Sequence, residues 1–432
     1  MLCNILHFLS FSISVFYSCG KINVQRSFLA LCLFASAMAA PSENSVAFQA
    51  VTQGAQLFSN NFVKTVVKEK PDNLICSPLS ADIALSMAAI GAAGQTQEEF
   101  KSVLKLPNTK AQTLEGFQNL IDKLNNVENV TLKLANKLYI GKDFPVKSEY
   151  KQDLETYYRS DIQSVDFSKK EEAANVVNTW CKEKTNDRIK SIINPDDIDA
   201  STALILANAV YFKGNWARQF NPKLTSDRPF HIDANTVKHV PTMYRQGNYK
   251  YAELPEYDAK CIELPYANKE VSMVIILPNK VDGLTPLIDK LEEVSAECSS
   301  RLAQTYEREV RLFLPKFRTE SKLDLANTLS QKMGLARAFS DSAEFSDISN
   351  IPLQISKVVQ KAFIEVNEEG SEAAAVTVSG LKLRGLSRRT QEFSVNHPFL
   401  CAIVTAAPGN KTARSNPLTL FIGQIFIPES SK

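Results

Sequence analysis

The segment Glu368-Glu-Gly-Ser-Glu-Ala-Ala-Ala-Val-Thr-Val-Ser-Gly-Leu-Lys-Leu-Arg-Gly-Leu-Ser-Arg-Arg389 has an unusual place and composition in this chain. It connects two strand-like runs, 362–366 and 393–404. A connection of this length inside a compact domain is uncommon unless it is functional or disordered. Its first half holds alanine and β-branched residues with little charge, whereas its second half is basic and contains bonds open to trypsin-like cleavage. This is not the composition of an ordinary linker.

The sequence on either side of this segment predicts a mixed α+β fold. Ser77-Pro78 is typical of a helix N-cap followed by proline in the first turn, apolar residues recur on one face as far as Ile90, and Gly91 ends the helix. A second helix is expected over 171–184. Strand-like runs come later, at 203–212, 271–277, 310–314 and 418–427. Helices first and strands later indicate one large domain with partly antiparallel sheets.

Composition and motifs exclude several classes of function. The 432 residues contain 49 Lys+Arg and 47 Asp+Glu, so the chain lacks the excess of basic residues that is typical of nucleic-acid-binding proteins. The four histidines, His7, His231, His239 and His397, lie in no catalytic or metal-binding motif. A hydrolase is therefore disfavoured. The absence of these motifs disfavours an enzyme of any kind, and we expect no metal or cofactor.

Residues 1–39 have the character of a leader that directs secretion. The first forty residues contain no Asp or Glu, and their apolar runs, 5–17 and 28–40, are each shorter than the ~20 residues of a membrane span. Ala37-Met38-Ala39 fits the small-x-small rule for signal cleavage after Ala39. Two alternatives stay open: residues 1–20 as an upstream start-site extension, and an uncleaved anchor that uses both runs.

Cysteine usage indicates a fold that does not depend on disulfides. Five cysteines remain outside the leader, an odd number at wide spacing, which gives neither a disulfide framework nor a zinc pattern. They are Cys76, Cys181, Cys261, Cys298 and Cys401. Two sequons, at Asn129 and Asn410, predict glycosylation in a secreted protein.

Six ordered blocks of sequence resemble the serpin family, the serine protease inhibitors, over residues 45–428. They include Asn73-Leu-Ile-Cys-Ser-Pro-Leu-Ser80, Leu206-Ala-Asn-Ala-Val-Tyr-Phe-Lys-Gly-Asn-Trp216 and Phe393-Ser-Val-Asn-His-Pro-Phe-Leu-Cys-Ala-Ile403. Within the family, the sequence is similar to secreted arthropod serpins. The resemblance implies a single domain with three β-sheets and about nine helices. It also implies an exposed reactive-centre loop over 368–392.

In inhibitory serpins the cleaved loop inserts as a new strand in the main sheet, and this sequence suits insertion. The resemblance assigns the hinge to Glu368, Glu369, Gly370, Ser371, Glu372, Ala373, Ala374 and Ala375. Because strand side chains alternate, the inward set would be Ser371, Ala373, Ala375, Thr377, Ser379 and Leu381, all of them uncharged. A shift of one residue would bury Glu372 and Lys382, which costs several kcal/mol without partners.

Counting from the hinge predicts the reactive bond. The family's scissile bond lies fourteen residues after the hinge glycine, which here is Arg384–Gly385. An arginine guanidinium suits the carboxylate of a trypsin-like specificity pocket. Leu381, Lys382 and Leu383 are expected to contact protease subsites. Cleavage at Lys382 or Arg388 remains an alternative.

The resemblance also implies residues around the opening of the main sheet. These are Ser77, Pro78, Ser80, Asn208, Trp216, Lys316 and Gln360, with Lys316 paired to Glu368. Many family members have histidine at the position of Gln360, and glutamine retains hydrogen-bonding capacity without titrating.

These observations predict a secreted, monomeric suicide inhibitor that forms a covalent acyl complex with trypsin-like serine proteases. It is expected to bind neither nucleic acid nor membrane. The alternative is a non-inhibitory serpin acting as a carrier, chaperone or storage protein. Proline or a bulky charged residue in the hinge would favour that alternative, and the run Ala373–Ala375 opposes it.

Overall fold

The computed structural model describes residues 45–69, 72–128, 130–369, 390–405 and 417–429. These residues belong to one compact unit, 43–432. The predicted leader, the sequons at Asn129 and Asn410, and the loop from Gly370 to Arg389 lie outside the described residues.

The described residues contain eight α-helices and a further helical segment that ends in a π-helical turn, Thr328–Lys332. The α-helices are α3 (Val46–Glu69), α4 (Pro78–Ala89), α5 (Gly94–Leu104), α6 (Lys110–Asn125), α7 (Ser148–Tyr158), α8 (Lys170–Lys184), α9 (Leu284–Asp289) and α10 (Leu291–Gln304). This agrees with the expected number of about nine helices.

Helix α4 begins where the sequence predicts it. The Ser77 side chain accepts a hydrogen bond from the Ser80 backbone N–H, and Pro78 occupies the first helical position. Every residue of α4 is buried. The sequence predicts one apolar face, whereas α4 is enclosed on all sides because its small residues, such as Ala84 and Ser86, let neighbouring elements approach closely.

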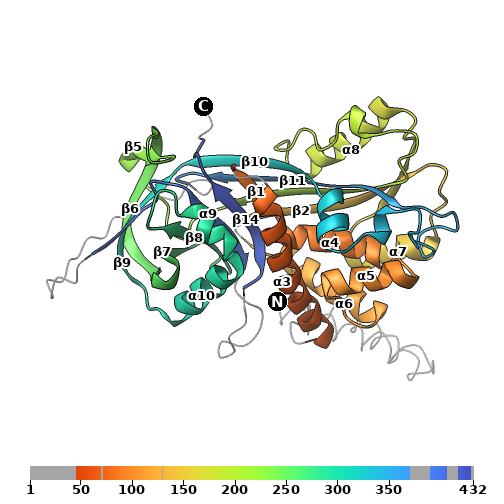
Figure 1. Cartoon of the computed structure of the whole chain (residues 1–432), viewed down its shortest axis with the longest axis horizontal. Helices are drawn as coiled ribbons and strands as arrows, with labels where there is room; N and C mark the ends of the chain where they lie inside the picture. Colours follow the sequence, from red (N-terminus) through yellow and green to blue (C-terminus); the bar gives the residue numbers. More distant parts are fainter. Residues whose placement is uncertain (1–44, 70–71, 129, 370–389, 406–416, 430–432) are drawn as a thin grey trace, which may run out of the picture. The chain divides into compact units, whose positions relative to one another are not determined.

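A five-stranded sheet lies between α8 on one side and α4–α7 on the other (Figure 1). Its order is β10 (Phe317–Asp324), β11 (Ile355–Val366), β4 (Leu204–Gly214), β2 (Val130–Gly141) and β3 (Ile162–Val165). The central pair, β11 and β4, is parallel, while β10 and β2 are antiparallel to their inner neighbours. The two central strands therefore run in the same direction with no strand between them.

The second sheet has nine strands and accounts for two of the three expected sheets. It consists of β1 (Leu74–Cys76), β14 (Thr419–Ile425), β13 (Phe399–Thr405), β8 (Val271–Pro278), β7 (Ala259–Pro265), β6 (Val237–Leu254), β9 (Arg308–Pro315), β12 (Gln391–Ser394) and β5 (Ser226–His231). The long strand β6 joins the two parts, because its residues 242–249 pair with β9 and its residues 250–254 pair with β7.

The run 393–404, which the sequence predicts as one strand, is divided between β12 and β13. Pro398 has no N–H to donate to a sheet, so it interrupts the ladder. His397 is buried at this corner with its Nε2 atom 2.7 Å from the carbonyl oxygen of Pro278, and the Asn396 carbonyl accepts from the His231 N–H.

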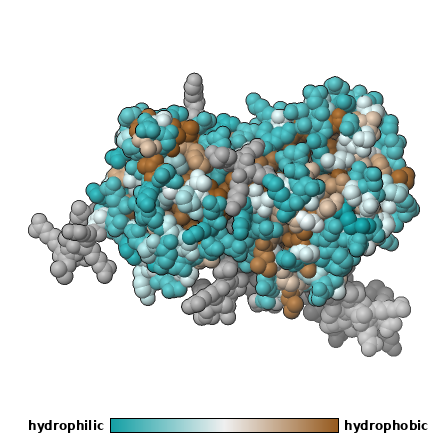
Figure 2. All heavy atoms as spheres, viewed as in Figure 1, coloured by the Kyte–Doolittle hydropathy of each residue, from teal (hydrophilic) through white to brown (hydrophobic). Residues whose placement is uncertain are grey.

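Each face of the five-stranded sheet packs on its own apolar cluster. In β4, and in β11 from Val358 onward, even-numbered residues such as Leu206 and Ile364 face the main core, and odd-numbered ones such as Tyr211 and Phe363 pack with α8. Hydrophilic residues cover most of the visible outer surface (Figure 2). Among the described residues, no helix is both long enough and apolar enough to cross a membrane.

The five described cysteines lie in these cores as free thiols. Burial raises the pKa of Cys76 and of Cys401 to about 12. A thiol with so high a pKa is a poor nucleophile, so these residues act as small apolar side chains.

Candidate functional site

The loop predicted to be reactive leaves the five-stranded sheet directly from its central parallel pair. Strand β11 ends at Val366, and Asn367–Glu369 are the last described residues before the loop. The chain is described again from Thr390 and enters β12, which pairs in parallel with β9. The two ends of the loop are thus attached to different sheets.

Three side-chain amides lie in line across the middle of the five-stranded sheet. In the strand register, Gln360 of β11 is opposite Asn208 of β4, which in turn is opposite Asn136 of β2. The Gln360 Nε2 atom donates to Asn208 Oδ1 over 2.6 Å, and the Asn208 side-chain nitrogen donates to Asn136 Oδ1. Gln360 and Asn208 are 0% and 1% exposed, so these hydrogen bonds form away from water, where an unpaired amide would be costly.

The N-terminus of α4 completes this polar cluster. The Ser77 N–H donates to Gln360 Oε1, and Gln360 Nε2 donates to the Ser77 carbonyl, each over 2.8 Å. The Asn208 side-chain nitrogen also donates to the Ser80 hydroxyl, and the Ser77 hydroxyl donates to the Leu420 carbonyl of β14. The cluster therefore fastens β4 to β11 and both strands to the helix beneath them.

A second group of contacts holds the chain where it leaves β11. The Trp216 indole N–H donates to the Asn367 carbonyl over 2.9 Å, and the Phe220 N–H donates to the Glu368 carbonyl over 3.0 Å. The Trp216 ring stacks on Tyr266, with centroids 4.6 Å apart and planes 9° apart. Aromatic packing thus fixes the indole that holds the first residues after β11.

Glu368 has two side-chain partners in this group. Its carboxylate accepts from Lys316 Nζ over 2.8 Å and from the Thr225 hydroxyl over 2.7 Å. Burial alone would raise the pKa of this carboxyl, but donation from Lys316 and Thr225 outweighs burial, and the pKa lies below its usual value. Glu368 is therefore held as a carboxylate at neutral pH.

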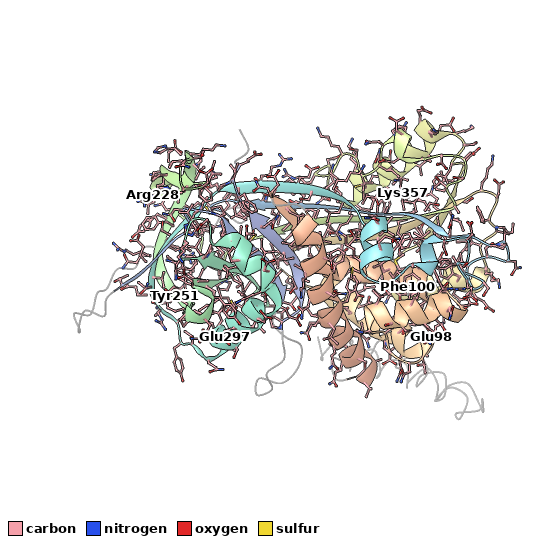
Figure 3. All side chains as sticks on the ribbon, viewed as in Figure 1. Glu98, Phe100, Arg228, Tyr251, Glu297 and Lys357 are labelled. Atoms are coloured by element: carbon pink, nitrogen blue, oxygen red, sulfur yellow. The ribbon has the colours of Figure 1, made fainter. Side chains whose placement is uncertain are left out.

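The far end of the loop has its own attachment at β12. The Phe393 ring packs edge-to-face on Tyr251, which is labelled in Figure 3, and the Gln391 side chain donates to the Tyr251 hydroxyl over 3.3 Å. Arg311 of β9 pairs with Glu392 over 2.9 Å. These contacts and the pairing with β9 anchor β12 in the nine-stranded sheet.

The structure brings the sequence-predicted residues into two places. Ser77, Ser80, Asn208 and Gln360 meet in the polar cluster, beside Pro78. Trp216, Lys316 and Glu368 meet where β11 ends, with Glu369 next along the chain. The remaining predicted loop residues lie outside the described part of the chain: Gly370, Ser371, Glu372, Ala373, Ala374, Ala375, Leu381, Lys382, Leu383, Arg384 and Gly385.

Sequence reasoning missed three residues of these groups. Asn136 could have been noticed because it takes a core-facing position in the alternation Leu132-Lys-Leu-Ala-Asn136. Thr225 and Phe220 gave no local signal, since their partner Glu368 lies more than 140 residues further along the chain.

Comparison with known proteins accounts for this arrangement. The family model described as Serpin (serine protease inhibitor) matches residues 53–428. The chain belongs to the serpin family. Alaserpin of Manduca sexta is 36% identical over 357 residues, which cover 81% of this chain and 90% of alaserpin. Antitrypsin of Bombyx mori is 34% identical over 377 residues, which cover 86% of this chain and 95% of that protein.

A solved structure supports the same fold for this serpin. Serpin48 of the insect Tenebrio molitor superposes with a TM-score of 0.78 at 32% identity, covering 89% of this chain and 100% of Serpin48. The prediction of an α+β serpin fold with three sheets and about nine helices is confirmed. The family is one of protease inhibitors, not of enzymes.

Proposed function

We propose that this serpin is a secreted suicide inhibitor of trypsin-like serine proteases. Cleavage after Arg384 gives an acyl-enzyme, which is trapped when the loop inserts between β4 and β11. The central parallel pair carries this proposal. Parallel ladders are slightly less stable per residue than antiparallel ones. A strand that enters between β4 and β11 and runs opposite to both would replace one parallel ladder with two antiparallel ladders.

The direction of the chain supports this insertion. Among the described residues, no element lies between the end of β11 and the loop, so a reversal at the hinge would send the chain back antiparallel to β11. Because β4 is parallel to β11, the same strand would also be antiparallel to β4. Gly370 gives the backbone freedom that such a reversal needs.

The side chains available for the inserted strand fit the two faces that would receive them. The core-facing residues of β4 and β11 around the polar cluster are apolar, including Leu206, Val210 and Ala362. The inward set from Ser371 to Leu381 contains no charge, whereas Glu372 and Lys382 belong to the other set. Insertion in this register would turn no ionised group toward the main core.

The proposed chemistry is the protease's own peptide hydrolysis, which stops at the acyl-enzyme. The protease serine hydroxyl adds to the Arg384 carbonyl carbon, and the Arg384–Gly385 bond breaks. The protease histidine passes the serine proton to the departing Gly385 nitrogen, which leaves an ester between serine and Arg384. Insertion of ~14 residues at ~3.3 Å each would then carry the acylated protease roughly 46 Å. Distortion of its oxyanion hole would stop hydrolysis of the ester.

Incubation with trypsin tests this proposal. We expect an adduct that survives SDS and a released C-terminal fragment that begins at Gly385. The Arg384→Ala variant should lose the trypsin adduct, whereas the matched Arg388→Ala variant should keep it. Loop cleavage without any adduct would instead favour the non-inhibitory alternative. Fragments that begin at Leu383 or Arg389 would show that the reactive bond follows Lys382 or Arg388.

Secretion, glycosylation and the monomeric state belong to the same proposal. N-terminal sequencing of the protein from the culture medium of expressing cells should start after Ala39. Mass spectrometry before and after glycosidase treatment should report glycans at Asn129 and Asn410. A native mass of one chain in solution is expected, and protein retained inside the cells would contradict secretion.

A further inference from the structure

Strand β2 has an open edge along more than half of its length. Its residues 130–140 pair with β4, but on the other side β3 pairs only with residues 138–141. Along residues 130–137 no strand among the described residues covers that second side. An uncovered edge presents backbone N–H and C=O groups to which another strand can bind.

The backbone directions identify which groups point into this edge. The Leu138 N–H donates to the Asp161 carbonyl beside β3, and the Asn136 carbonyl accepts from the Ser160 hydroxyl over 2.6 Å. Even-numbered residues therefore direct their backbone polar groups away from β4. By the two-residue repeat of a strand, the backbone groups of Leu132 and Leu134 point the same way. Within the described residues no hydrogen bond to them from this side is seen.

A groove with a volume of about 680 Å³ runs along this edge. Ile121 and Leu124 of α6 and Tyr158 of α7 line one wall, and Trp180 and Lys184 of α8 line the other. The stretch 131–135 of β2 is about 17 Å long at ~3.3 Å per residue, which is enough for an added strand of about five residues.

The two walls differ in chemistry. Leu132 and Leu134 pack on the main core together with the α6 and α7 wall, so that side is mainly apolar, with Asn125, Glu155 and Arg159 also lining it. Lys133 lies on the opposite face of β2, toward α8, where Lys184 also lines the groove. Both lysines are exposed, and neither forms an ion pair within the described part of the chain.

Other charged side chains in the groove leave these two lysines available. Lys137 pairs with Asp161 over 3.1 Å, and Arg159 pairs with Asp122 over 2.7 Å. Glu183 beside Lys184 is the acidic group on the α8 wall, and it is also exposed. A strand in the groove would therefore meet apolar surface with alternate side chains and a mainly basic wall with those between.

We propose that this groove binds an extended peptide segment of a partner protein, which pairs with the open edge of β2. Hydrogen bonds to Leu132 and Leu134 would supply affinity, and the walls would select apolar residues alternating with acidic ones. The acidic residues face Lys133 and Lys184.

Asn136 connects this groove to the polar cluster between β4 and β11. This residue lies at the end of the open edge, and its side chain accepts from Asn208 in the polar cluster. A strand that holds β2 in place resists the shift of β2 that separation of β4 from β11 requires. A bound peptide therefore slows loop insertion, and this second effect rests on the proposed inhibitory function.

The test uses a capped heptapeptide of alternating valine and glutamate with the intact, full-length protein. Hydrogen exchange is measured over residues 131–135 with this peptide and with a control peptide of the same sequence. The control is N-methylated at the positions that would donate to β2. We expect protection of the Leu132 and Leu134 amides by the first peptide alone. Equal protection by both peptides, or protection by neither up to millimolar concentration, would overturn the proposal.

Charge reversal on α8 tests the selection of acidic residues. Lys184→Glu should weaken binding of the valine–glutamate peptide about fivefold, the scale of an exposed charge pair. The matched variant Lys182→Glu changes an exposed lysine of the same helix outside the groove and should bind normally. Equal binding by both variants would refute acidic selection. The trypsin adduct, measured without peptide, reports separately on the proposed function.

Discussion

Gln360 of β11 and Asn208 of β4 are joined by a hydrogen bond of 2.6 Å between the two strands that a new strand would have to separate. The amide oxygen and the amide nitrogen of Gln360 also form hydrogen bonds with the Ser77 backbone. Insertion between β4 and β11 must break the Gln360–Asn208 contact. The polar cluster thus stabilises the five-stranded form and resists its opening.

Removing this amide should weaken the five-stranded form. Gln360→Ala deletes one side of three buried hydrogen bonds and leaves their partners unsatisfied, so the free energy of unfolding should fall by about 1–3 kcal/mol. Spontaneous loop insertion or association should also become faster. Urea unfolding and native gels after mild heating measure the two effects.

The control is Gln246→Ala, because Gln246 is exposed and bonds only Glu309 among the partners seen. Its effect on stability should stay within about 0.5 kcal/mol. If both glutamine variants behave like the wild type, the polar cluster does not hold the sheet closed.

Glu368 should make stability depend on pH. Its pKa in the folded protein is lowered, so its pairing with Lys316 and Thr225 stabilises the fold above the unfolded-state pKa of about 4.3, and this contribution is lost as pH falls through the folded value. Glu368→Gln should lower the free energy of unfolding by about 1–3 kcal/mol at pH 7. The difference from wild type should vanish in acid.

Stability measured from pH 7 to pH 3 checks this expectation. Glu172→Gln is the control, since Glu172 is 71% exposed and pairs with Lys169 on the surface of α8. Such exposed pairs contribute little. A gap between wild type and Glu368→Gln that stayed constant with pH would contradict the role given to the carboxylate.

The sequence predicted much of this site because its signals are local or belong to family blocks. Ser77 and Pro78 predict the start of α4, because both residue types are favoured at the first positions of a helix. Trp216 lies in the block 206–216, which resembles the serpin family. The parallel pairing of β4 with β11 could not be predicted from either strand, because register depends on contacts 152 residues apart, as between Asn208 and Gln360.

Strand β2 shows why other parts were missed. Its outer half is only partly buried, and Lys133 and Lys137 interrupt its apolar residues, so no continuous strand-like run is visible. The split of 393–404 into β12 and β13 had a local signal in Pro398, but the apolar residues on both sides of this proline favoured a single strand.

Alternation in the hinge predicts different effects for neighbouring alanines. Ala373→Glu puts a charge on the inward face of the inserted strand, which should slow insertion and turn the protein from inhibitor into substrate. Ala374→Glu puts the same charge on the outward face and should keep inhibition. The ratio of adduct to cleaved protein after reaction with trypsin measures both. Equal ratios would show that the register is wrong.

Specificity should follow the residue at 384 alone. Arg384→Phe should abolish the adduct with trypsin and create one with chymotrypsin, whose specificity pocket is apolar. The trapping step does not involve this side chain, so the yield of adduct should be similar. Arg388→Phe should leave the reaction with trypsin unchanged. Continued trapping of trypsin by Arg384→Phe would place the reactive bond elsewhere.

The most direct measurement compares the thermal unfolding of the intact protein with that of the protein cut once within 370–389. Insertion adds a central strand with two antiparallel ladders, so the cut form should melt at least about 10 °C higher, at about 2 °C per kcal/mol for a large domain. A cut form that melts at the same temperature as the intact protein, or below it, would contradict insertion between β4 and β11.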